Sequence, residues 1–197
     1  MAKVLFQGHG SLRLELNNGK VVYIDPFAGE GYDKPADLIL VTHQHYDHTE
    51  VNRPPHADDC VIYQNMDALK GGVYNTLDIY GMHIEAVQAC NKNHPIDECV
   101  GYLIEADGKL MYFAGDTSKT EQMQQLAQRH IDYAFLPADG IYNMDVPEAV
   151  ECAEIIGAKH TVPIHISPGK LFDLERAKRF TTSSAMIVEP GNEIEII

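Results

Sequence analysis

The chain has 197 residues with 29 acidic and 15 basic side chains, so its formal charge is −14 at pH 7. This length is sufficient for one domain with a substantial core, and we expect a single domain over residues 1–197. The acidic balance argues against binding of nucleic acid through a basic surface. No apolar stretch has the length of a membrane span or of a signal peptide, which predicts a cytoplasmic protein with no membrane partner.

The first third of the chain has the pattern of short strands. Asn17-Asn18-Gly19 is expected to form a hairpin turn between the second strand and the third. The pair Pro54-Pro55 and its polar neighbours predict irregular structure between Val51 and Asp59. The expected elements are the strands Lys3–Phe6, Leu12–Leu16, Val21–Ile24, Leu38–Val41 and Val61–Tyr63, and a helical turn over Met66–Lys70.

A second group of strands follows, and after it helices alternate with strands. The turn Ala106-Asp107-Gly108 joins the last two strands of this group, and Ser118, Pro147 and Asp173 mark the starts of three helices. Many strands followed by this alternation predict an α+β fold of packed sheets and helices. The expected strands are Tyr74–Ile79, His83–Ala89, Val100–Glu105, Leu110–Phe113, Tyr133–Leu136, His160–Ile164 and Met186–Glu189, and the expected helices are Lys119–His130, Pro147–Gly157 and Asp173–Phe180.

The segment from Thr42 to Thr49 concentrates the side chains that bind metals, namely His43, His45, Asp47 and His48. It follows a strand that is expected to be buried, so these side chains should converge in a loop at the end of that strand. Imidazole and carboxylate groups bind zinc, iron and manganese, and one loop can direct its side chains toward two neighbouring ions. The sequence therefore predicts a site for two divalent metal ions, with zinc as the first candidate and manganese or iron as the others.

Two ions need further ligands from distant segments, and His94, Asp116 and His165 can supply them. Asp116 and His165 each follow an expected strand, and a carboxylate can bridge two cations. His83 is the alternative to His94, but His83 lies inside an expected strand, whereas Pro95 favours an extended loop at His94. One ion would then bind His43, His45 and His94, and the other would bind Asp47, His48 and His165, with Asp116 between them.

This constellation resembles the metallo-β-lactamase superfamily, whose motif His-x-His-x-Asp-His is followed by a histidine, a Gly-Asp pair and a late histidine. Gly8–Ser11, Ile24–Phe27 and Ala36-Asp37 are similar to its branch of small metal-dependent hydrolases, which includes L-ascorbate-6-phosphate lactonase-like proteins. The resemblance implies a four-layer αβ/βα sandwich with a dinuclear site at one edge of two facing sheets. Class B β-lactamases have cysteine in place of Asp116, and flavodiiron reductases have glutamate in place of His45. Antibiotic hydrolysis and redox chemistry are therefore not expected.

Two ions roughly 3.5 to 4 Å apart can hold a bridging water, lower its pKa and deliver hydroxide to a carbonyl or phosphoryl centre. Asp47 is the candidate catalytic residue, because it can orient this hydroxide and carry a proton to the leaving group. The expected function is hydrolysis of a small-molecule ester, lactone or phosphoester, anionic substrates included. The alternatives are a phosphodiesterase for a cyclic nucleotide or phospholipid-type substrate, and a non-catalytic metal-binding sensor on the same fold.

Other polar residues surround the predicted centre. Asp25 either orients the 43–48 loop through hydrogen bonds, as the resemblance implies, or forms a turn before Pro26. His9 follows the first strand and could face the metal cleft, but a structural role is favoured. Capping or surface roles are favoured for Thr117, Ser118, Ser167 and Lys170, the loop residues Tyr142 and Asn143 could line the pocket, and His56, His130 and His160 are expected to have ordinary roles.

Overall fold

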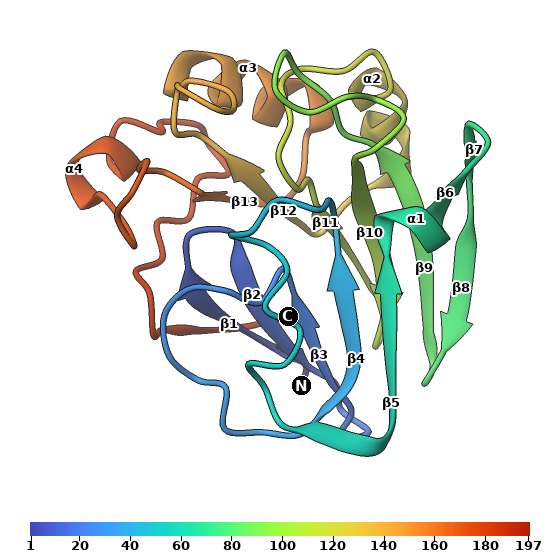
Figure 1. The fold of residues 1–197 in the computed structure, drawn as a ribbon. Coiled ribbons are helices and arrows are strands. Elements are labelled where there is room, and N and C mark those ends of the chain that lie inside the picture. The colour runs from blue at the N-terminus through green and yellow to red at the C-terminus, as the bar shows by residue number, and fades with distance from the viewer.

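The structure, a computed structural model that describes all residues from 1 to 197, contains two facing six-stranded β-sheets (Figure 1). The first sheet consists of β1 (Lys3–Gly8), β2 (Ser11–Glu15), β3 (Val21–Ile24), β4 (Ala36–Val41), β5 (His56–Gln64) and β14 (Glu193–Glu195). Its strand order is β14-β1-β2-β3-β4-β5. The strands from β14 to β3 are antiparallel to their neighbours, whereas β4 runs parallel to both β3 and β5.

The second sheet consists of β8 (Thr76–Ile79), β9 (Met82–Gln88), β10 (Val100–Ala106), β11 (Lys109–Phe113), β12 (Tyr133–Pro137) and β13 (His160–Ile164). Its order is β13-β12-β11-β10-β9-β8, antiparallel from β8 to β11 and parallel from β11 to β13. The short strands β6 (Leu69–Lys70) and β7 (Val73–Tyr74) form a separate ribbon. Both predicted hairpin turns are confirmed, and Asp107 and Gly108 between β10 and β11 have the positive φ angles of a type I′ turn.

The main hydrophobic core lies between the two sheets. Alternate side chains of each strand enter it, such as Val4 and Phe6 of β1 and Tyr102 of β10. A second core lies on the outer face of the second sheet, where Tyr112 packs with side chains from the helices, and a small cluster around Tyr23 covers the outer face of the first sheet. These layers confirm the predicted α+β sandwich.

The helices are α1 (Asn65–Ala68), α2 (Met123–Leu126) with the 3₁₀ turn η1 (Ala127–Arg129), α3 (Val146–Ile156) and α4 (Leu174–Ala177). The prediction of α3 is confirmed: the side chain of Asp145 accepts a hydrogen bond from the Glu148 amide, Pro147 lies in the first turn, and Gly157 ends the helix with a left-handed conformation. Helices α2 and α3 cover the second sheet (Figure 1). No helix is both long and apolar enough to span a bilayer.

The helix predicted over Lys119–His130 is wrong in extent, because only α2 and η1 form there. Ser118 does not cap it: the Ser118 N–H donates to the carbonyl of Cys90, and the Thr117 hydroxyl accepts from the Cys90 N–H. These bonds hold the segment after β11 against the end of β9. The helix therefore starts several residues later than its sequence pattern suggests.

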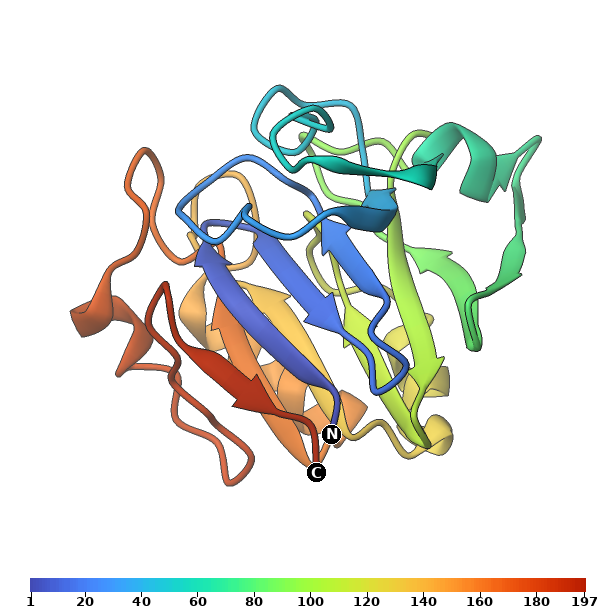
Figure 2. The ribbon, with the colours of Figure 1, turned by 90° about the horizontal axis from the view of Figure 1, so that it is seen from below.

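The C-terminal region also differs from the prediction. No strand forms over Met186–Glu189, and the residue just before this segment, Ala185, pairs with β13 only through an isolated bridge to Thr161. The last strand is instead β14, which pairs with β1 and brings the two chain ends together (Figure 2). Asp173 caps α4 as expected, but α4 ends at Ala177 rather than at Phe180. Strand β5 begins at His56, so the irregular structure predicted as far as Asp59 is shorter than expected.

The ends of β4 and β11 meet closely at one edge of the sandwich, and Gly115 makes this approach possible. Gly115 has a φ of +62°, and a Cβ at this position would lie 2.9 Å from both the Thr42 Cβ and the Val100 carbonyl oxygen. Any side chain would therefore separate Asp116, the next residue, from the loop that begins at Thr42. The glycine of the predicted Gly-Asp pair is required by close backbone approach as well as by its conformation.

We expect Gly115→Ala to destabilise the fold more than Gly108→Ala. Both glycines have a positive φ, so alanine costs about 1 to 2 kcal/mol of backbone strain at either position. A Cβ at Gly108 would have no heavy atom within 4 Å, whereas a Cβ at Gly115 would, and overpacking there should add about 1 to 3 kcal/mol. Urea denaturation of the two variants measures the difference; equal stabilities would contradict the close approach.

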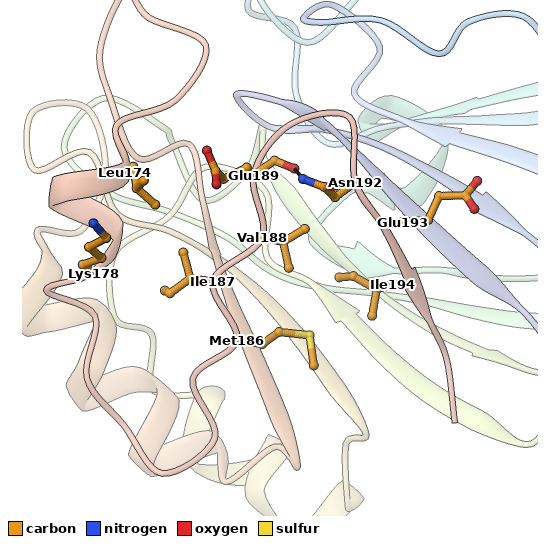
Figure 3. A pocket seen from close by; sticks show the side chains of 9 residues that line it. All are labelled: Leu174, Lys178, Met186, Ile187, Val188, Glu189, Asn192, Glu193 and Ile194. Atoms are coloured by element: carbon orange, nitrogen blue, oxygen red, sulfur yellow. Dashed lines mark hydrogen bonds between the residues drawn. The ribbon is translucent and has the colours of Figure 1, made fainter.

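A cavity of about 560 Å³ lies between α4 and the C-terminal segment (Figure 3). Its lining contains apolar side chains such as Met186, Val188 and Ile194, with Lys178 and Glu189 at its polar side. It contains no histidine or cysteine, and none of the predicted metal ligands contributes to it. The chemistry predicted from the sequence belongs to a different cavity.

Candidate metal centre

A cavity of about 1060 Å³ opens at the edge of the sandwich where β4, β11 and β13 end. Five of the predicted ligands contribute to its wall: His45, Asp47, His94, Asp116 and His165. The remaining two, His43 and His48, are buried. All seven residues therefore gather in one region, although they come from four separate segments of the chain.

Six of these residues fall into two groups in which the possible ligand atoms all lie within 4.8 Å of one another, and His43 and His48 also form a third such group with Asp25. One group contains His43, His45 and His94, whose ring centroids are 4.7 to 4.8 Å apart. The other contains Asp47, His48, His165 and, in addition, His9. The structure thus brings together the two sets proposed from the sequence. His83 belongs to neither set, because its Nδ1 lies 2.7 Å from the carboxylate of Asp78 on the surface.

Asp116 lies between the two groups. Its Oδ2 is 3.4 Å from the Nε2 of His94 and 3.4 Å from the Nε2 of His165, and its Oδ1 is 3.6 Å from the Nε2 of His48. One carboxylate therefore faces a histidine of the first group and two histidines of the second. This is the position that a bridging ligand requires.

Two residues that are not proposed ligands, Thr42 and Asp25, orient the histidines that follow β4. Residues that hydrogen-bond to a proposed ligand in this way are called outer residues below. The Thr42 hydroxyl donates to the Oδ2 of Asp25 at 2.7 Å, so the Nδ1–H of His43, 3.0 Å away, donates to the Thr42 oxygen. The Nδ1 of His48 lies 2.8 Å from the same Asp25 oxygen and donates to it. Asp25 also accepts the Thr42 amide, so it is an orienting residue rather than a simple turn residue.

Two further outer residues, which the sequence reasoning missed, orient the other histidines. The Nδ1 of His94 donates to the Oδ1 of Asn91 at 2.9 Å, and the Nδ1 of His165 lies 3.0 Å from the Oδ2 of Asp139. Asp139 lies two residues beyond the end of β12, and Asp116 and His165 were predicted as ligands from similar positions just after a strand. Asp139 could have been predicted from this position. For Asn91 the sequence offers only its closeness to His94.

The orientation of the rings directs several ring nitrogens toward the interior of the centre. The Nε2 atoms of His43, His48 and His165 are buried and have no hydrogen-bond partner, and the Nε2 of His94 lies 3.1 Å from the Nδ1 of His45. Buried polar atoms without partners are costly, and a cation bound between these nitrogens and the Asp116 carboxylate would satisfy them. The donor set therefore fits divalent metal ions such as zinc, manganese or iron.

The charges within the centre are strongly coupled. Burial and the charge of His48 lower the pKa of His43 to about 2, so its imidazole is neutral. Burial alone would lower the pKa of His48, but the carboxylates of Asp116 and Asp25 outweigh it and raise the pKa to about 9. Burial opposes ionisation of Asp116, but His165 and His48 hold the pKa of this carboxyl well below its ordinary value. Without metal the cluster holds protons, which a bound cation would displace.

Three residues at the centre have left-handed backbone conformations that side chains rarely adopt. The φ angles are +53° for His9, +47° for Asp25 and +43° for His165. Strained backbone of this kind persists where surrounding contacts enforce it, and it is frequent at functional sites. Contacts around His9 must therefore offset the strain of its left-handed backbone, as they do for Asp25 and His165.

The other residues named from the sequence have varied positions. Tyr142 and Lys170 line the cavity, whereas the side chain of Asn143 donates to Asp139 and Ser167 is buried outside the lining. Thr117 and Ser118 make the contacts to Cys90 that hold their segment against β9. His56 contacts the Val51 carbonyl, His130 ends η1 and His160 stacks on Tyr133, so none of these three joins the centre.

The sandwich of two mixed sheets with a histidine and aspartate centre at one edge is the metallo-β-lactamase fold. A family model described as "Beta-lactamase superfamily domain" matches residues 3–165, which include every residue of the centre. The chain therefore belongs to the β-lactamase superfamily, as its motif predicted.

Relatives and solved structures agree with this assignment. A metal-dependent hydrolase of Pyrococcus abyssi is 31% identical over 227 aligned positions that cover all of both chains. A crystal structure from Parabacteroides distasonis, assigned as a metal-dependent hydrolase, has 32% identity, a TM-score of 0.80 and coverage of 96% of this chain and 93% of that one. A Thermotoga maritima protein assigned as a zinc-dependent hydrolase of the metallo-β-lactamase superfamily shares the fold, with 22% identity, a TM-score of 0.68 and coverage of 91% and 84%.

Proposed function

We propose that this protein is a dinuclear metal-dependent hydrolase of small esters, lactones or phosphoesters. One divalent ion is bound by His43, His45 and His94, and the second by Asp47, His48 and His165. Asp116 bridges the two ions. The position of Asp116 carries the proposal, because its two carboxylate oxygens lie within 3.4 to 3.6 Å of nitrogens from both groups.

The relatives support the same chemistry, since proteins that match over the whole chain are named metal-dependent hydrolases. When bound, a pair of such ions polarises the substrate and activates water for attack at neutral pH. Ligands that are all nitrogen or oxygen suit zinc, manganese and iron, and zinc is our first choice.

Asp47 is placed to handle the proton of the attacking water. Its side chain is partly exposed at the cavity wall, and the pKa of its carboxyl is lowered because the hydrogen bond from His9 and the charge of His48 outweigh burial. An ionised carboxylate can accept a proton from the attacking water and pass it to the leaving oxygen. Asp47 is therefore the catalytic acid–base residue in this proposal.

The cavity wall suits a small substrate with both apolar and charged parts. Phe27 and Tyr46 contact each other edge to face with ring centroids 5.8 Å apart and form an aromatic wall. Lys170 lines the same cavity and forms no ion pair, whereas most lysines of this acidic chain are paired with a carboxylate. An ammonium without an ion-pair partner in the same cavity as the metal ligands favours substrates that carry a negative charge.

The proposal is tested by assaying metal-free protein reloaded with zinc, manganese or iron. The substrate panel contains aliphatic and phosphorylated lactones, aryl esters, phosphomonoesters and phosphodiesters, with and without an added carboxylate. We expect turnover of lactones or simple esters that a chelator abolishes and the same metal restores. Turnover that survives chelation would contradict the proposal. Turnover of phosphodiesters alone would favour the phosphodiesterase, and no turnover with both ions bound would favour a metal sensor.

A further inference from the structure

His9 touches the second metal group from a different part of the chain. It lies in the tight turn between β1 and β2, in the first sheet, whereas His165 follows β13 in the second sheet. The centroids of the two imidazole rings are only 3.6 Å apart, and the backbone N–H of His165 donates to the backbone carbonyl of His9 at 2.7 Å. The His9 N–H in turn donates to the Leu171 carbonyl at 3.0 Å. His9 therefore contacts both the backbone and the ring of His165.

The same ring also fixes Asp47. The Nε2 of His9 lies 3.0 Å from the Oδ2 of Asp47, and His9 is the only side chain that hydrogen-bonds this carboxylate. The Nδ1 atoms of His43, His48 and His94 are hydrogen-bonded to oxygen acceptors of outer residues, and the Nδ1 of His165 faces the Asp139 carboxylate at 3.0 Å. Asp47 needs the opposite partner, a donor, and His9 supplies one.

The geometry distinguishes this role from that of a metal ligand. At 3.0 Å from an ionised carboxylate, the Nε2 of His9 must carry the proton of the hydrogen bond. A protonated nitrogen has no lone pair for a cation, although its distance from His48 and His165 would otherwise suit one.

We propose that His9 is a positioning residue for the second metal ion, which acts by donating a hydrogen bond from Nε2 to Asp47 while its ring packs on His165. The inference rests on the proposed dinuclear site, since it assigns Asp47 and His165 to one ion. It also explains why His9 keeps a strained backbone with a φ of +53°. His9 makes no ring or hydrogen-bond contact with His43, His45 or His94, so the affinity for the first ion should depend on His9 much less.

The test is a zinc titration of metal-free protein against a chromophoric chelator, which resolves two binding steps. In His9→Phe the ring can still pack on His165 but cannot donate, so we expect the second dissociation constant to rise about 10- to 100-fold. The first constant should stay within about threefold of wild type. His9→Gln keeps an N–H donor of similar reach and should recover most of the lost affinity. The matched controls are His83→Phe and His83→Gln, which change a surface histidine outside the centre.

Several results would overturn the inference. A His9→Phe variant that binds both ions like wild type, or that loses both equally, excludes a selective role at the second ion. A His9→Gln variant as weak as His9→Phe excludes hydrogen-bond donation as the cause. Thermal melting of each variant in chelator verifies that the fold is retained. A wild-type chain that binds a single ion would instead contradict the dinuclear site itself, whatever the His9 variants do.

Discussion

Asp116→Ala should lower the metal content from two ions per chain to one or none and reduce hydrolysis on the order of 10³-fold. The physical reason is the shared carboxylate: its oxygens face His94, His165 and His48, so its removal takes a ligand from both ions at once. Inductively coupled plasma mass spectrometry, together with the preferred substrate from the panel, measures both effects.

Two further variants test whether the effect of Asp116→Ala comes from loss of this particular carboxylate. Asp116→Asn keeps the size of the side chain but removes its charge, so it should retain the fold while binding metal more weakly than wild type. Asp97→Ala removes an exposed carboxylate from the nearby loop and should leave metal content and turnover unchanged. Two ions per chain in Asp116→Ala would contradict the bridging role.

Asp25→Ala should cause a large loss of stability. Asp25 is almost fully buried and accepts three hydrogen bonds, from the Thr42 amide, the Thr42 hydroxyl and the Nδ1 of His48. Alanine would leave these donors buried without an acceptor, at a cost of about 3 to 5 kcal/mol. Since about 1 kcal/mol corresponds to roughly 2 to 4 °C in a chain of this size, the melting temperature should fall by roughly 6 to 20 °C.

The measurement is thermal denaturation in chelator, so that metal binding does not contribute. Asp58→Ala is the matched control: Asp58 is exposed on β5 and forms no ion pair, and its loss should change stability by less than about 0.5 kcal/mol. If Asp25→Ala unfolded at the same temperature as Asp58→Ala, the Asp25 network would not stabilise the fold.

The seven residues proposed as ligands could be found from the sequence because each lies in a recognisable local context. The dense run at 43–48 and the strand-end positions of Asp116 and His165 are properties of short segments. The choice of His94 over His83 depended on the neighbouring Pro95, and the structure places only His94 in the centre.

The outer residues were harder to predict, because their roles depend on tertiary contacts. The Asp139 carboxylate approaches His165 only after β12 and β13 pair, and Asn91 contacts His94 through a small loop bridge. His9 follows the first strand, but its local sequence does not indicate its partners, which lie 38 and 156 positions away along the chain. Hydrogen bonds at Ser118 likewise shortened a helix that its local pattern favoured.

The central claim is that two metal ions share Asp116, and anomalous diffraction from crystals of zinc-loaded protein tests it most directly. The proposed site predicts two anomalous peaks roughly 3.5 to 4 Å apart, one beside His43, His45 and His94 and the other beside Asp47, His48 and His165, with Asp116 between them. A single peak, or two peaks that do not share Asp116, would contradict it.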